Sequence, residues 1–143
     1  MLVKEIMVRD VKTTGLDSTI QEAAQLMSEH SIGCLIVVEN DKLEGIITER
    51  DIVRRVVSEN RIPSETKVRT AMSQEVVLIR PDATVEEAAE AMTAHKVKKL
   101  PVVENNQLVG IVTTADVTAS QPKLVEQLSA IFLIPKKKKL MGG

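Results

Sequence analysis

Two stretches of the sequence share one pattern, GIITERD at residues 45–51 and GIVTTAD at residues 110–116. Each begins with a glycine and two apolar residues, which are typical of the end of a β-strand. A threonine follows, and an aspartate comes three positions later. The two stretches lie 65 residues apart. This repetition indicates that the chain contains one structural unit written twice.

The duplication extends over most of the chain. When residues 3–53 are aligned without gaps to residues 68–118, 20 of the 51 pairs are identical. A gapless match of this length indicates an internal repeat. Each unit alone is small for an adequate core, so we expect the two to pack together about a pseudo-twofold axis. The expected segments are a first repeat at 3–58, a connector at 59–67, a second repeat at 68–121, and a C-terminal amphipathic helix with a basic tail at 122–143.

Both repeats show the same order of local patterns. Thr19 with Glu22, and Thr84 with Glu87, form capping boxes at the start of a helix, and apolar residues follow at helical spacing. Two β-branched runs around an Asn/Asp turn then predict paired strands. Each repeat is therefore predicted to contain a short strand, a helix, two strands and a helix. The fold class is α/β (α+β).

The last helix of each repeat is predicted to differ. In the first repeat, DIVRRVVSEN places four apolar residues on one helical face: Ile52, Val53, Val56 and Val57. In the second repeat, Pro122 interrupts the helix, because proline cannot donate the helical hydrogen bond. A new apolar stripe begins at Leu124.

Composition and charge narrow the classes of function. The 19 Lys and Arg residues nearly cancel 20 Asp and Glu residues, so no overall charge favours nucleic acid. Cys34 is the only cysteine, which leaves no intrachain disulfide and no zinc cluster. His30 and His95 stand singly at predicted helix ends, and no metal site is predicted. No apolar run approaches the ~20 residues of a membrane helix, and no signal peptide pattern opens the chain. We expect a cytoplasmic protein without a membrane partner.

Several features together resemble the CBS domain, and the pair of repeats resembles a Bateman module. These features are the order of elements, the helix entry PDATVEEAAEAM at 81–92, the strand KKLPVVE at 98–104, and the endings GIITERD and GIVTTAD. The resemblance spans about residues 3–119. It implies two β-α-β-β-α CBS repeats about a pseudo-twofold axis, with adenosine-containing ligands bound in clefts between them. It also implies a disc-shaped dimer.

The Thr–x–x–Asp motifs at Thr48–Asp51 and Thr113–Asp116 allow two interpretations. In the first, the threonine caps the following helix and the aspartate completes a capping box. In the second, the motif is a binding site. Aspartate is a methylene shorter than the glutamate of the other boxes, so it reaches back less well and leaves its carboxylate free to face a cleft. The helix N-terminus is also favourable for phosphate. The residues alone leave both interpretations open.

The resemblance favours a site, and it implies a role for each position. Asp51 and Asp116 accept hydrogen bonds from ribose hydroxyls, the threonines donate to phosphate or ribose oxygens, and Ile46 and Ile111 contact the adenine. For the Asp116 cleft the implied residues are Lys12, Ile32, Lys98, Lys99, Ile111 and Thr113. For the Asp51 cleft they are Ile46, Thr48, Arg50, Val77 and Val97.

The two clefts are expected to bind different ligands. Lys98 and Lys99 resemble the family's phosphate-contacting pair and lie beside Asp116 in this pattern, with Lys12 as a third cation. Several ammonium groups favour phosphate strongly. The Asp116 cleft is therefore expected to prefer AMP, ADP or ATP. The other cleft carries only Arg50 and is expected to bind a nucleotide more weakly, or S-adenosylmethionine. A purely solvated role for the lysine pair stays open.

The predicted function is a regulatory module that senses an adenosine nucleotide and signals to an unidentified protein. It requires no cofactor, and the expected assembly is a homodimer. The sequence contains no phosphate-binding P-loop motif and no evident nucleophile–base pair, so no enzyme activity is predicted. Two alternatives remain. One is a ligand-free interaction scaffold, and the other is nucleic-acid binding through Lys136–Lys139, for which a solvated tail is the simpler interpretation.

Overall fold

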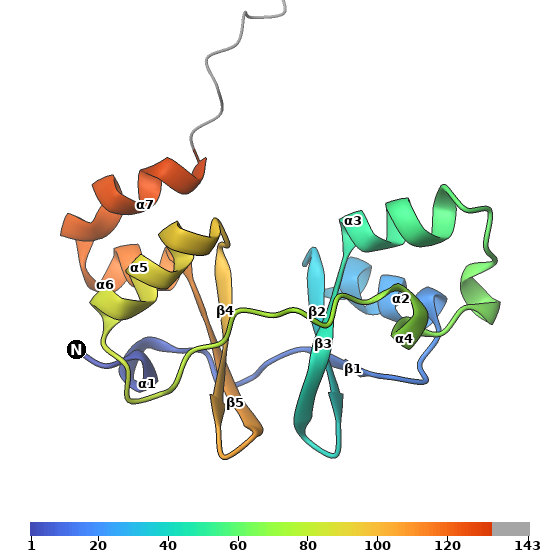
Figure 1. Cartoon of the computed structure of the whole chain (residues 1–143), viewed down its shortest axis with the longest axis horizontal. Helices are drawn as coiled ribbons and strands as arrows, with labels where there is room; N and C mark the ends of the chain where they lie inside the picture. Colours follow the sequence, from blue (N-terminus) through green and yellow to red (C-terminus); the bar gives the residue numbers. More distant parts are fainter. Residues whose placement is uncertain (133–143) are drawn as a thin grey trace, which may run out of the picture.

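The computed structural model describes residues 1–132, and the predicted basic stretch Lys136–Lys139 lies outside them. The chain forms two similar halves side by side, with the larger helices at one end and two β-hairpins at the other (Figure 1). The predicted mixed class of helices and strands is confirmed.

Helices and strands alternate in a similar order in the two repeats. The first repeat contains α1 (Val3–Ile6), β1 (Thr13–Gly15), α2 (Ile20–His30), β2 (Cys34–Glu39), β3 (Lys42–Thr48), α3 (Glu49–Ile52) and the π-helical segment η1 (Val53–Val57). After a 3-10 turn at Pro63–Glu65, the rest contains α4 (Val68–Ala71), α5 (Val85–His95), β4 (Lys99–Glu104), β5 (Gln107–Thr113), α6 (Thr114–Ser120), a 3-10 turn at Pro122–Leu124 and α7 (Val125–Phe132).

The two long helices begin where the capping boxes predict. In α2, the Thr19 hydroxyl accepts a hydrogen bond from the Glu22 backbone N–H at 3.1 Å, and the Glu22 carboxylate accepts one from the Thr19 N–H at 2.8 Å. Thr84 and Glu87 repeat this arrangement in α5 at 3.0 and 2.9 Å. These reciprocal bonds satisfy N–H groups that a helix start otherwise leaves without partners.

The second repeat lacks the predicted first strand. In the first repeat β1 pairs in parallel with β2, whereas the corresponding segment of the second repeat makes one bridge, Ile79 to Val102. Pro101 in β4 explains the difference. It occupies the position of Ile36, whose backbone N–H donates to the Lys12 carbonyl at 3.4 Å. Proline has no N–H to donate, so the ladder stays short.

The helix after β3 also differs from its prediction. Of the apolar residues predicted on one face, Val56 is fully buried, but Val53 is 57% exposed and Val57 is 64% exposed. The chain changes from α-helix to π-helix after Ile52, which rotates successive side chains differently. The predicted interruption at Pro122 is confirmed.

The two repeats exchange their leading segments. α1 belongs to the first repeat in sequence, yet Val3 is fully buried in the apolar core of the second repeat. α4 belongs to the second repeat, yet Val68 lies in the core of the first. Figure 1 shows α1 in the half that contains α5 and α6, and α4 in the half that contains α2 and α3.

The exchange is held by four isolated backbone bridges, Leu2–Thr84, Val8–Ile111, Thr19–Lys67 and Ile46–Ser73. Val8 and Ile111 bond through N···O distances of 2.8 and 2.9 Å, and Ile46 and Ser73 do so at 2.9 and 2.8 Å. Between β3 and β5 themselves, the paired register is confined to Lys42 and Gln107. The exchanged segments therefore connect the two halves more extensively than the sheet does.

The motif glycines make room for these crossing segments. A Cβ at Gly45 would lie 2.6 Å from the Ser73 carbonyl oxygen, and a Cβ at Gly110 would lie 3.0 Å from the Val8 carbonyl oxygen. Each Cβ would also meet a methionine sulfur, that of Met72 at 3.0 Å and that of Met7 at 2.6 Å, but the backbone oxygens cannot turn aside as a side chain can. The glycine that opens each motif is thus required by packing between the repeats.

We expect Gly45→Ala to lower the free energy of unfolding by about 1–3 kcal/mol, because the added methyl group overpacks against backbone. Urea denaturation measures the change. Gly15→Ala is the matched control, since its Cβ would meet only the Ser18 hydroxyl, at 3.6 Å. Equal stability of the two variants would contradict the close-packing account.

Candidate functional site

Thr48 and Asp51 form a complete capping box. The Asp51 N–H donates to the Thr48 hydroxyl at 3.0 Å, and the Thr48 N–H donates to Asp51 Oδ2 at 3.0 Å. The expectation that the shorter aspartate reaches back poorly was therefore wrong. The structural interpretation of the motif is confirmed for this copy, and one carboxylate oxygen is engaged by it.

Thr113 and Asp116 form the second box. Asp116 Oδ2 accepts from the Thr113 N–H at 2.9 Å and from its hydroxyl at 3.0 Å. The helices behind both motifs are short, four residues in α3 and seven in α6. Their dipoles therefore add little to an argument for phosphate, which must depend on cationic side chains instead.

The two aspartates differ in how far the chain already satisfies them. Asp51 is only 8% exposed, and the Ser73 hydroxyl lies within hydrogen-bonding distance of its Oδ1, at 3.4 Å. Val8 takes the place of Ser73 beside the other motif and has no hydroxyl. Within residues 1–132, Oδ1 of Asp116 has no hydrogen-bond donor, and the residue is partly exposed. Asp116 thus retains more capacity to accept a ligand hydroxyl.

A small cleft lies beside Thr113, at the junction of the two repeats; we call it the Asp116 cleft. Its volume is about 190 Å³. Its walls are formed by Val8, Asp10, Val11, Lys12, Ile32, Cys34, Ile36, Lys99, Ile111 and Thr113. Five of the residues predicted for this cleft therefore meet in it, although they come from four separate parts of the chain. Asp116 itself stands behind Thr113 and does not line the cavity.

Two cations face this cleft, and each has a partner in it. Lys12 Nζ lies 2.9 Å from the Asp10 carboxylate. This hydrogen bond and the ammonium charge hold the pKa of Asp10 below its usual value. Lys99 Nζ lies 3.6 Å from the Cys34 sulfur. Sequence reasoning missed Asp10 as a cleft residue, although an acid two positions before Lys12 is a pattern that predicts an ion pair on an extended segment.

Lys98 does not join Lys99 in the cleft. Its ammonium lies over the ring of Phe132, 4.9 Å from the centroid, in a cation–π contact with the end of α7. Successive residues entering a strand point to opposite sides, so two adjacent lysines could not both face the cavity. The predicted lysine pair is separated by this alternation.

The residues predicted for the Asp51 cleft are placed differently. The backbone of Ile46 is hydrogen-bonded to the backbone of Ser73, and Arg50 is exposed on α3. Val77 and Val97 are partly buried against the apolar core of the second repeat. The chain itself thus occupies much of the hydrogen-bonding capacity around Asp51.

The described residues carry neither a metal cluster nor a membrane-spanning helix. Within residues 1–132, no three His, Cys, Asp or Glu side chains are grouped so as to hold a metal ion. In the same part of the chain, no helix combines the length and the apolar character needed to cross a membrane.

Comparison with known proteins agrees with the fold. The family model described as the CBS domain matches residues 3–58 and 68–122. The chain therefore belongs to the CBS-domain family and carries two copies of the domain. It is 40% identical over 119 residues to a CBS domain-containing protein of Bacillus subtilis, YhcV, covering 83% of this chain and 84% of that one.

Two other similar proteins bear on function. The chain is 41% identical over 116 residues to inosine-5'-monophosphate dehydrogenase of Methanocaldococcus jannaschii, covering 79% of this chain but only 22% of that enzyme. It is also similar to the solved structure of a hexameric CBS-CP12 protein from bloom-forming cyanobacteria. The TM-score is 0.70 at 29% identity, with 98% of this chain and 77% of that chain covered. A tandem CBS pair is a regulatory kind of module, and some structural neighbours are oligomeric.

We expect Asp51→Ala to destabilise the protein more than Asp116→Ala. Both changes remove a capping acceptor, which costs about 1 kcal/mol. The first also leaves the Ser73 hydroxyl without its acceptor beside a residue that is only 8% exposed, whereas the Thr113 hydroxyl freed by the second lies beside the partly exposed position 116, where water can replace the acceptor. Urea unfolding of the two variants measures the difference, and equal losses would show that the Ser73 contact contributes nothing.

Proposed function

We propose that the protein is a regulatory module that binds an adenosine nucleotide in the Asp116 cleft and signals to a partner protein. It acts in the cytoplasm as a self-associated molecule and catalyses no reaction. The single observation that supports this most is the Asp116 cleft itself, where two lysines and an apolar wall from both repeats converge beside a threonine–aspartate pair.

The proposed binding mode uses each group according to its chemistry. Ile32 and Ile111 contact the adenine, and a ribose hydroxyl reaches past Thr113 to Oδ1 of Asp116, which lies outside the present cavity. The phosphate displaces the Asp10 carboxylate from Lys12 and the Cys34 sulfur from Lys99. The bond from Lys99 to a phosphate is charge-assisted and is stronger than its present contact with the Cys34 sulfur, whereas Lys12 exchanges one charge-assisted partner for another.

The cleft is small, so binding in this way requires side chains to move. Its volume of about 190 Å³ lies below the roughly 300–1,000 Å³ of most small-molecule pockets. Binding therefore requires the Lys12 and Lys99 side chains to move out of their present contacts. Each ammonium group is carried on a flexible four-carbon chain, so it can move without a change in the backbone.

The Asp51 side is proposed as the weaker site. Asp51 is nearly buried and near the Ser73 hydroxyl, so a ribose must displace an internal contact there. A less charged adenosyl compound such as S-adenosylmethionine suits the single exposed cation, Arg50. The two CBS domains support a regulatory role, and the similarity to the dehydrogenase of Methanocaldococcus jannaschii covers only 22% of that enzyme.

Nucleotide binding is tested by thermal and urea unfolding with AMP, ADP, ATP and S-adenosylmethionine. A ligand present at about 100 times its dissociation constant adds about 2.7 kcal/mol of stability. Stabilisation by a nucleotide is the expected result. If none of these compounds shifts the unfolding transition, the ligand-free scaffold is favoured instead, since both capping boxes are already complete without a ligand.

The cleft is assigned by calorimetric titration of AMP into two matched variants. Lys99→Met is expected to weaken binding by about 10- to 100-fold, the value of one charge-assisted hydrogen bond. Lys98→Met removes the same charge one position away, outside the cleft, and is expected to leave the affinity nearly unchanged. Equal losses in both variants, or unchanged affinity in Asp116→Ala, would overturn the assignment.

A further inference from the structure

Asp10 and Lys12 form an ion pair at the Asp116 cleft. Both residues line the cavity, and Asp10 Oδ2 lies 2.9 Å from Lys12 Nζ. The Asp10 side chain is 83% exposed, whereas the Lys12 side chain is 39% exposed. The carboxylate therefore stands at the open side of the cleft, bound to an ammonium group that a phosphate needs.

The fold does not require this ion pair. Ion pairs between exposed side chains contribute little to stability. The internal repeat provides a direct comparison, because Glu75 and Val77 occupy the positions of Asp10 and Lys12 in the second repeat. Valine carries no charge, so the second repeat folds without such a pair. The pair is therefore a feature of this one cleft rather than of the repeated unit.

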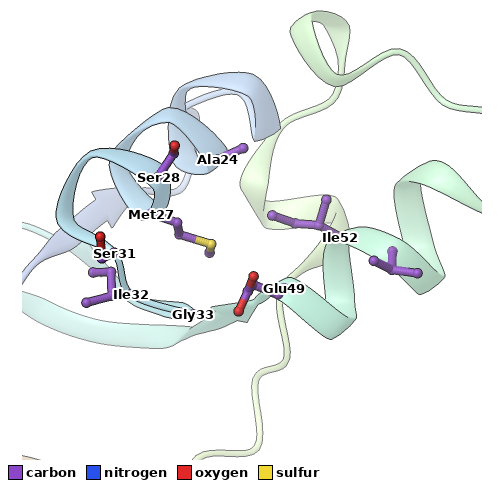
Figure 2. A pocket seen from close by; sticks show the side chains of 9 residues that line it. Ala24, Met27, Ser28, Ser31, Ile32, Gly33, Glu49 and Ile52 are labelled. Carbon is purple, nitrogen blue, oxygen red and sulfur yellow. The ribbon is translucent and has the colours of Figure 1, made fainter.

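A larger groove between α2 and α3 offers no cation to a phosphate. Its volume is about 540 Å³. Figure 2 shows Ala24 and Met27 on one side of the groove and Ile52 on the other, with the Glu49 carboxylate between them. Among the described residues that line this groove, Glu49 is the only charged one, and it repels an anion. Selection among phosphate compounds is therefore sought in the Asp116 cleft.

The charges that line the Asp116 cleft suit one phosphate group. Lys12 and Lys99 are positive and Asp10 is negative, so the described lining residues carry a net charge of +1. A phosphate monoester carries a charge of about −1.5 to −2 at pH 7, which already exceeds this positive charge. Two lysines without Asp10 would balance it. The excess negative charge that a second or third phosphate group meets therefore comes from Asp10.

Asp10 stays close to the phosphate after it leaves Lys12. The two residues are separated by one other residue, which limits the distance between their Cα atoms to about 7 Å. The hydrogen bond from Lys12 holds the pKa of the Asp10 carboxyl below its usual value, so the group is charged at neutral pH. Since the cavity measures only about 190 Å³, additional phosphate groups extend towards its open side, where Asp10 stands.

We propose that Asp10 makes the Asp116 cleft select a nucleotide with one phosphate group over a nucleotide with three. Lys12 and Lys99 bind the first phosphate group, and the Asp10 carboxylate repels those that follow. AMP is therefore favoured over ATP. This inference rests on the nucleotide binding of the proposed function, to which it adds the residue that determines phosphate specificity.

The specificity is measured by calorimetric titration of AMP and of ATP, in buffer without divalent cations, into the full chain and its variants. The wild-type chain is expected to bind AMP more tightly than ATP. Asp10→Asn is expected to reduce the ratio of the ATP and AMP dissociation constants by about three- to tenfold, because the further phosphate charges no longer lie several Å from a carboxylate. Asp82→Asn is the matched control and is expected to leave the ratio unchanged. It breaks a similarly exposed pair of the same spacing, Arg80–Asp82 at 3.2 Å, whose residues do not line this cleft.

Two further measurements separate charge from a structural role of position 10. Asp10→Glu keeps the charge and is expected to keep the ratio, and added salt is expected to narrow the ratio in the wild-type chain more than in Asp10→Asn. An unchanged ratio in Asp10→Asn overturns the inference while nucleotide binding stands, and so does a wild-type chain that binds ATP as tightly as AMP. If the wild-type chain binds neither compound, the proposed function itself fails, and this inference fails with it.

Discussion

The structure depends on the reciprocal contact between the leading segment of each repeat and the last strand of the other. Val8 pairs with Ile111, and Ser73 pairs with Ile46, through backbone hydrogen bonds of ordinary length. Because Val3 and Val68 are buried in the opposite core, neither repeat completes its own apolar core. The two repeats therefore form one cooperative unit, and the motif glycines are required by the backbone that crosses them.

The same exchange creates the candidate site. It brings Lys12, which follows the crossing segment of the first repeat, to Ile111 and Thr113 at the end of the second. One substitution between the copies then makes the two motifs unequal. Ser73 supplies a hydroxyl beside Asp51, whereas Val8 supplies none beside Asp116. The two pseudo-symmetric motifs thus differ. The carboxylate of Asp51 is hydrogen-bonded by the chain itself at both oxygens, whereas Oδ1 of Asp116 remains available as an acceptor within residues 1–132.

The sequence predicted the features that are determined locally. Capping boxes connect residues three positions apart, and the repeat is visible by direct alignment, so the helix starts and the strand pairs were predictable. The exchanged segments were not, because they join residues such as Val8 and Ile111 whose contact leaves no mark at short range. Val57 lies beyond a change to π-helix that the sequence pattern does not indicate, and the separation of Lys98 from Lys99 depends on which side of a strand each residue faces.

Lys98 and Lys99 are adjacent in the sequence but contact different parts of the protein. Lys99 lines the cleft, and its neighbour Lys98 holds the Phe132 ring at the end of α7. They share one peptide bond at the start of β4, a strand that is tied to β5 along its length. The lysine of the cleft and the lysine that contacts α7 are therefore sequence neighbours whose side chains face opposite sides of the chain.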